Sequence, residues 1–94
     1  MTESVLSNKK RCFFCGSERG LHRHHVYEGC RRRISEREGC WVYLCPIHHN
    51  GSDLAVHFNR ENDLFLKELC EKAWIVKNNA TKEDFIRVFG KNYL

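Results

Sequence analysis

The sequence predicts a small α+β domain in which two short strands precede two longer helices, with paired cysteine and histidine residues in its first half. Three observations lead to this prediction. The chain has 94 residues, a length that suits one domain. Metal-binding residue types recur in pairs separated by two residues, at Cys12 with Cys15 and at Cys45 with His48. Apolar residues alternate along part of the first half and recur every three or four residues along the second.

The N-terminal residues 1–11 are polar and basic, and we expect them to form a mobile lead-in to a single folded domain, residues 12–94. They contain no apolar run typical of a signal peptide, and no segment of the chain approaches the roughly 18 apolar residues of a membrane span. We therefore expect a cytoplasmic protein without membrane contact. A reducing cytoplasm favours metal binding for the cysteine pairs, and a disulfide scaffold is the alternative.

The two pairs together have the composition of a four-ligand zinc site, formed by Cys12, Cys15, Cys45 and His48. Thiolates and imidazole are the ligands that zinc prefers, and two such pairs clamp the ion from two chain segments. His49 is the alternative fourth ligand. A structural zinc here would tie the N-terminal pair to the segment after the second strand, and four unrelated residues are the competing interpretation.

Two segments have the residue pattern of strands. Residues 21–26 alternate apolar and polar side chains, and Trp41–Leu44 is aromatic and β-branched. We expect them to form a hairpin. Because neighbouring residues of a strand face opposite sides, His24 and His25 should point to different faces of this hairpin.

The excess positive charge lies entirely in the first half of the chain. Residues 1–50 carry nine lysines and arginines against five acids, whereas residues 51–94 carry seven of each. We expect residues 28–39 to form a loop at the hairpin tip, with a single helical turn starting at Ser35. Four arginines of this loop would contact the phosphates of a polyanion, and a solvated, internally ion-paired loop is the alternative. They are Arg31, Arg32, Arg33 and Arg37.

Helix signals dominate the remainder of the chain. Pro46 can open a short helix directly after the second strand. Residues 61–77 have the periodicity of an amphipathic helix, and Thr81-Lys82-Glu83-Asp84 is a variant capping box that begins a helix ending near Phe89. We expect these two helices, within residues 61–89, to pack across the hairpin.

Five histidines lie outside the four-ligand site, and three of them are the main candidates for chemistry: His24, His25 and His49. An unperturbed histidine titrates near pH 6.5, which suits His25 to act as a general base. His24 could bind a divalent cation together with His49 from the following helix, and such a cation would stabilise charge on a phosphate. His57 could complete the metal shell. Ordinary core or surface histidines are the alternative interpretation.

These motifs, read together over residues 12–50, resemble the HNH nucleases of the ββα-metal class. The shared features are Cys-x2-Cys, a His-His pair ending a strand, and Leu-Cys-x2-His-His. The likeness is to the small zinc-stapled, treble-clef-like members found in phages and prophages. Val56-His57-Phe58-Asn59 and the ending at residues 89–94 also resemble that group.

The resemblance implies a ββα-metal core over residues 12–50, extended by the C-terminal helices. It implies a DNA endonuclease that hydrolyses phosphodiester bonds, with His25 activating the attacking water. His24 and His49 would hold the catalytic divalent cation, either Mg²⁺ or Mn²⁺, with Zn²⁺ or Ni²⁺ as alternatives. DNA is the implied partner, a recombination or packaging protein is a possible second one, and a bacterial or phage-infected cell is the implied setting.

One position departs from the family pattern. The asparagine of the family name, which orients the general base, usually lies shortly before the second metal-binding pair. In this chain that position is Cys40, so the sequence does not indicate which residue supports His25. The departure favours an alternative function, a zinc-stapled DNA-binding or assembly module that has kept the fold and lost catalysis.

Overall fold

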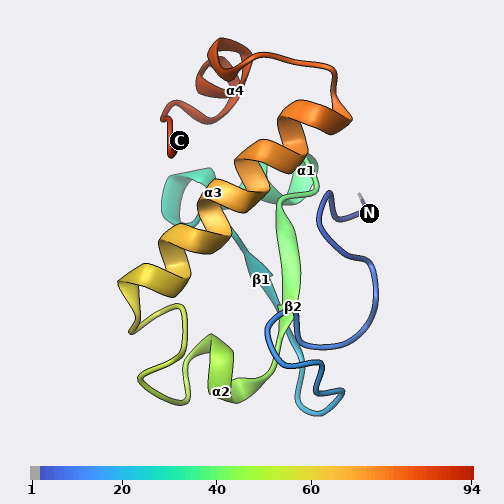
Figure 1. The fold of residues 1–94 in the computed structure, drawn as a ribbon, viewed down its shortest axis with the longest axis vertical. Helices are drawn as coiled ribbons and strands as arrows, with labels where there is room; N and C mark the ends of the chain where they lie inside the picture. The colour runs from blue at the N-terminus through green and yellow to red at the C-terminus, as the bar shows by residue number, and fades with distance from the viewer. Residues whose placement is uncertain (1–2) are drawn as a thin grey trace.

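The structure is a computed structural model that describes residues 3–94, and it shows a small α+β domain built around one two-stranded sheet (Figure 1). β1 (His22–His25) pairs antiparallel with β2 (Trp41–Leu44), and the register sets His24 opposite Val42. The predicted hairpin is confirmed, although β1 is one residue shorter at each end than expected.

The hairpin tip is helical. It contains a 3-10 turn, η1 (Gly29–Arg31), followed by α1 (Arg32–Arg37), so the prediction of a loop with one turn from Ser35 was wrong. Ser35 lies inside α1 and is fully buried. Its hydroxyl accepts a hydrogen bond from the Tyr27 amide at 3.2 Å and donates one to the Cys40 carbonyl. These two bonds hold the helical tip against both strand ends.

A short helix follows β2 as predicted. α2 (Pro46–His49) begins with proline and is followed by Gly51, where a Cβ would lie 2.6 Å from the Pro46 carbonyl oxygen, so only glycine fits. The chain then folds back along α2. The His57 amide donates to the His49 carbonyl at 3.4 Å, which brings His57 beside this helix.

Two helices follow as predicted, but only the first of them crosses the hairpin. α3 (Arg60–Lys77) crosses the sheet, and α4 (Lys82–Phe89) packs against α3 near the helical tip (Figure 1). The Thr81 capping box is present, with the Thr81 side chain and the Asp84 amide 3.1 Å apart. Within residues 3–94, no helix combines the length and the apolar character needed to cross a bilayer.

The core lies between the hairpin and these two helices. The Tyr27 hydroxyl donates to the Lys67 carbonyl at 2.7 Å, and the Trp74 indole donates to Glu38 at 3.0 Å, so α3 is bonded to both ends of the tip. Removing the apolar surface from water is the main stabilising contribution. The fully buried large side chains include Val26, Tyr27, Val42, Leu44, Leu66, Cys70 and Phe85.

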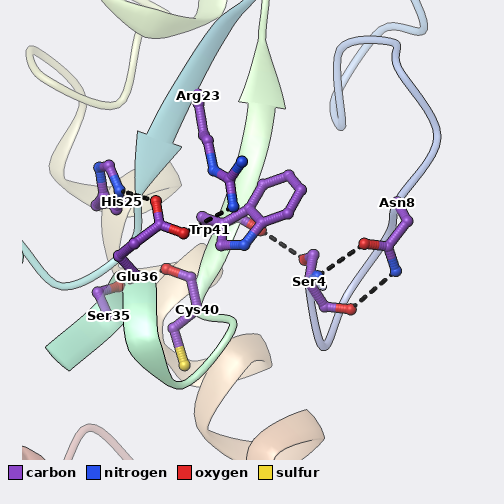
Figure 2. Close-up of polar contacts among 8 residues, drawn as sticks. All are labelled: Ser4, Asn8, Arg23, His25, Ser35, Glu36, Cys40 and Trp41. Carbon is purple, nitrogen blue, oxygen red and sulfur yellow. Dashed lines mark hydrogen bonds and ion pairs between the residues drawn. The ribbon is translucent and has the colours of Figure 1, made fainter. Parts of the chain in front are cut away.

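The N-terminal segment lies along the hairpin. Residues 1–2 of the predicted lead-in fall outside the described residues, but residues 3–8 pack beside β2. The Ser4 hydroxyl donates to the Trp41 carbonyl at 2.5 Å (Figure 2). The Val5 amide donates to the Gly39 carbonyl at 2.8 Å. Ser4 is buried by these contacts, so the start of the chain braces the outer edge of β2, where a mobile lead-in was expected.

Candidate metal centres and a basic groove

The two sequence pairs meet in a four-residue cluster that could hold a metal ion: Cys12, Cys15, Cys45 and His48. The sulfur atoms of Cys15 and Cys45 are 3.7 Å apart, and His48 Nδ1 lies 3.3 Å from the Cys45 sulfur. A tetrahedral zinc with bonds of about 2.3 Å to sulfur and about 2.0 Å to nitrogen would separate neighbouring ligand atoms by about 3.5–3.8 Å. The residues therefore fit a tetrahedral ion, and His48, not His49, belongs to this cluster.

Backbone contacts preset the cluster. The Phe13 amide donates to the Tyr43 carbonyl at 2.9 Å, which attaches the first pair to β2. The His48 amide donates to the Cys45 carbonyl at 3.1 Å within the first turn of α2. Four ligands from two distant segments are thereby held at one point, and a bound ion would lock the N-terminal knuckle to the sheet.

A second cluster contains three of the remaining histidines: His24, His49 and His57. One nitrogen from each lies within 4.8 Å of the others, so this group too could hold a metal ion. The Nε2 atoms of His49 and His57 are 3.1 Å apart. His22, which shares a face of β1 with His24, also approaches His49, with an Nδ1–Nδ1 distance of 3.0 Å.

The environment of this cluster lowers the pKa of two of its imidazoles, those of His24 and His49. Burial lowers the pKa of His24 to about 3, with further lowering from the neighbouring charges of His49 and His57. The pKa of His49 is also lowered, first by burial and then by His57 and His22. Neutral imidazole is the form that binds metals. Both rings are therefore ready to act as ligands at neutral pH.

His25 faces the other side of β1, as the strand geometry predicts. Its Nε2 lies 2.8 Å from Glu36 Oε1, and the other carboxylate oxygen of Glu36 accepts from Arg23 at 2.7 Å (Figure 2). The Arg23 guanidinium in turn lies 3.6 Å from the centroid of the Trp41 ring. A carboxylate only accepts hydrogen bonds, so a neutral His25 beside Glu36 would carry its ring proton on Nε2 and keep the Nδ1 lone pair for use as a base.

Cys40, at the family asparagine position, has a different role. It is fully buried, and its amide donates to the Ser35 carbonyl at 2.8 Å. The side-chain partner of His25 is Glu36 from α1. The structure therefore buries Cys40 in the core and places Glu36 beside His25.

The four arginines of the tip are not equivalent. Arg31 Nε donates to the Phe89 carbonyl at 2.7 Å, so this side chain joins η1 to α4 and is placed differently from the phosphate contact expected for it. Arg37 Nε pairs with Glu38 at 3.0 Å and remains largely exposed. Arg32, Arg33 and Arg37 line a hollow of about 990 Å³ that also contains His25 and Glu36.

A smaller hollow of about 360 Å³ adjoins it. Its lining includes the three-histidine cluster, and it shares His25, Gly29 and Arg32 with the larger hollow. The larger hollow is a basic groove, because Arg32, Arg33 and Arg37 line it. His25 therefore lies where this basic groove meets the histidine cluster. A phosphate group could bind at this junction, with the rest of a phosphodiester chain lying along the arginines.

Several residues of the site were missed from the sequence. Glu28, Glu36 and Asp63 bring carboxylates to the two histidine environments, and His22 approaches His49. Alternation along β1 could have indicated His22. Nothing in the local pattern distinguishes Glu36 from the other acids of the tip, because its role depends on how α1 packs against β1.

Comparisons of this chain with protein-family models, with curated proteins and with solved structures found no match. The geometry of the two clusters and the groove is therefore the basis of the functional argument.

Proposed function

We propose that the protein is a metal-dependent DNA endonuclease of the HNH type, which hydrolyses a phosphodiester bond with a water activated by His25. One observation carries the proposal. His24 and His25 are adjacent on β1, yet His24 belongs to a buried histidine cluster while His25 is bonded to a carboxylate at the edge of a basic groove. This division of environments supports one metal ligand and one general base.

The metal assignments follow the chemistry of the two clusters. Zinc is the proposed ion of the Cys/His cluster, because three thiolates and one imidazole at tetrahedral spacing are ligands that zinc prefers. His24 and His49, with His57, would hold the catalytic cation, for which Mg²⁺ or Mn²⁺ is proposed and Zn²⁺ or Ni²⁺ are alternatives. When bound, that cation would supply Lewis-acid stabilisation of charge on the phosphate.

The remaining steps belong to protein side chains. His25 Nδ1 takes a proton from water as the water oxygen bonds to phosphorus, and the phosphorus–oxygen bond on the opposite side breaks. Glu36 fixes the tautomer of His25 and would stabilise the imidazolium that forms. Arg32, Arg33 and Arg37 would hold the DNA backbone along the groove by contacts that carry no sequence information.

A zinc-stapled binding module without catalysis is the competing function, and Cys40 in place of the family asparagine favours it. A nicking assay on supercoiled plasmid separates the two. We expect open-circle product in Mg²⁺ or Mn²⁺ and none in EDTA, because one site cuts one strand. DNA binding without metal-dependent cleavage of duplex, branched or single-stranded DNA would establish the binding module instead.

The groove assignment is tested by replacing Arg32 and Arg33 together with alanine. Both line the hollow next to His25, so we expect weaker DNA binding in a filter or fluorescence assay. The loss should be similar for all sequences, and the salt dependence should flatten by about one in slope for each lost phosphate contact.

The matched control removes the same charge elsewhere. Arg60→Ala with Arg87→Ala takes away two exposed arginines that line neither hollow, and it should bind DNA nearly as the wild type does. Equal low-salt affinity of the Arg32/Arg33 variant and this control would show that DNA does not lie in the groove.

A further inference from the structure

A second group of metal-ligating side chains adjoins the three-histidine cluster. It consists of His24 from β1, Glu28 directly before η1, and Asp63 in the first turn of α3. One ligand atom from each lies within 4.8 Å of the other two. The group joins two neighbouring residues, His24 and Glu28, to the distant Asp63, and it shares only His24 with the cluster described above.

Two atoms of this group lack hydrogen-bond partners among residues 3–94. His24 Nε2 and Asp63 Oδ1 are both buried without a partner, and the His24 side chain is only 2% exposed. Glu28 Oε1 is 3.6 Å from His24 Nε2, which is too long for a hydrogen bond. Buried polar atoms are nearly always satisfied, and a bound ion is one accepted explanation where they are not.

The two carboxylate oxygens of Asp63 have different surroundings. Oδ2 accepts from the Lys67 ammonium at 2.8 Å, one helical turn along α3. Oδ1 has no such partner within the described chain. The ion pair with Lys67 therefore uses one oxygen of Asp63 and leaves the other oxygen available to a cation.

The ligand atoms of His24, Glu28 and Asp63 are harder donors than those of the three-histidine cluster. Two carboxylates and one imidazole suit a hard cation, since Mg²⁺ and Mn²⁺ prefer oxygen ligands. Three imidazoles alone would favour Zn²⁺ or Ni²⁺, the alternative ions named above, so carboxylate oxygens beside His24 would make the site better suited to Mg²⁺ or Mn²⁺. The two groups share His24 and therefore lie next to each other.

We propose that His24, Glu28 and Asp63 form a binding site for a hard divalent cation, Mn²⁺ or Mg²⁺, next to the three-histidine cluster. The site adds two carboxylate ligands that the function proposed above does not use. Cation binding is measured without DNA, so this proposal can be confirmed or refuted separately from nuclease activity.

The test is a titration of the full chain with Mn²⁺ after the protein has been loaded with one equivalent of zinc. Binding is measured as a decrease in the electron paramagnetic resonance signal of free Mn²⁺. We expect one bound Mn²⁺ in the wild type. Asp63→Asn and Glu28→Gln should each weaken its affinity by at least about tenfold, because loss even of an outer-shell partner of a metal site typically costs about 10–100-fold.

Lys67→Gln is the matched control for Asp63→Asn. It breaks the same ion pair on α3 but keeps both oxygens of Asp63, so Mn²⁺ affinity should be kept or increased. Circular dichroism should show that all variants retain the fold. Wild-type Mn²⁺ affinity in folded Asp63→Asn would overturn the proposal. If His57→Ala lost Mn²⁺ while Asp63→Asn kept it, the cation would be assigned to the histidines alone.

Discussion

Replacing His25 with alanine is expected to abolish DNA cleavage while leaving cation and DNA binding nearly unchanged. His25 contacts Glu36 and borders both hollows, but it belongs to none of the three groups of candidate metal ligands among the described residues. Loss of a general base typically costs about 10²–10⁴ in rate. Plasmid nicking rates in Mg²⁺ and Mn²⁺ measure the effect, and wild-type cleavage by the folded variant would rule out this mechanism.

Variants of the metal ligands should behave differently from His25→Ala. His24→Ala and His49→Ala remove members of the histidine cluster, so they should weaken the cation and respond at least partly to excess Mn²⁺. His25→Ala should not respond to added metal. All three variants should keep the Cys/His-bound zinc, since its four ligands are other residues. A metal response of His25→Ala would assign this residue to the cation instead.

Glu36→Gln gives an intermediate test of the same assignment. The change leaves His25 in place but removes the carboxylate that accepts from its ring, so the base loses its fixed tautomer. Cleavage should slow by less than the about 10²–10⁴ expected for removal of the base itself, and its pH profile should shift. A role of Glu36 confined to folding would leave the pH profile of the folded variant unchanged.

Cys12→Ser is expected to release the metal of the Cys/His cluster and to lose most of the folded state. Cys12 is 2% exposed, and its sulfur lies 3.7 Å from His48 Nδ1. Structural zinc contributes about 10–16 kcal/mol in zinc-finger peptides. This is comparable with the whole stability of a typical domain, about 5–15 kcal/mol. Zinc content by mass spectrometry and thermal melting measure the two losses.

Cys30→Ser is the matched control for this variant. Cys30 is exposed and belongs to no candidate metal group in the described chain, so its replacement should preserve both zinc content and melting temperature. A Cys12→Ser protein without zinc but with an unchanged melting curve would refute a structural role for the ion. Retention of zinc in Cys12→Ser would instead refute the ligand assignment.

Much of the local structure could be predicted because it depends on residues close together in sequence. Trp41–Leu44 is β-branched and aromatic and forms β2 as expected, and Thr81 caps α4 through its own next turn. The two-residue spacing of Cys12 with Cys15 lets one ion reach both side chains whatever the rest of the fold does. The opposite orientations of His24 and His25 likewise follow from strand geometry alone.

The tertiary structure decided which distant side chains meet. Glu36 reaches His25 only because α1 forms at the hairpin tip and packs against β1, where a loop was predicted. Arg31 donates a hydrogen bond to the Phe89 carbonyl of α4. Asp63 lies near His24 because α3 crosses the sheet. These contacts join residues from 11 to 58 positions apart. Their geometry depends on how whole elements pack, which no local pattern of charge or hydrophobicity encodes.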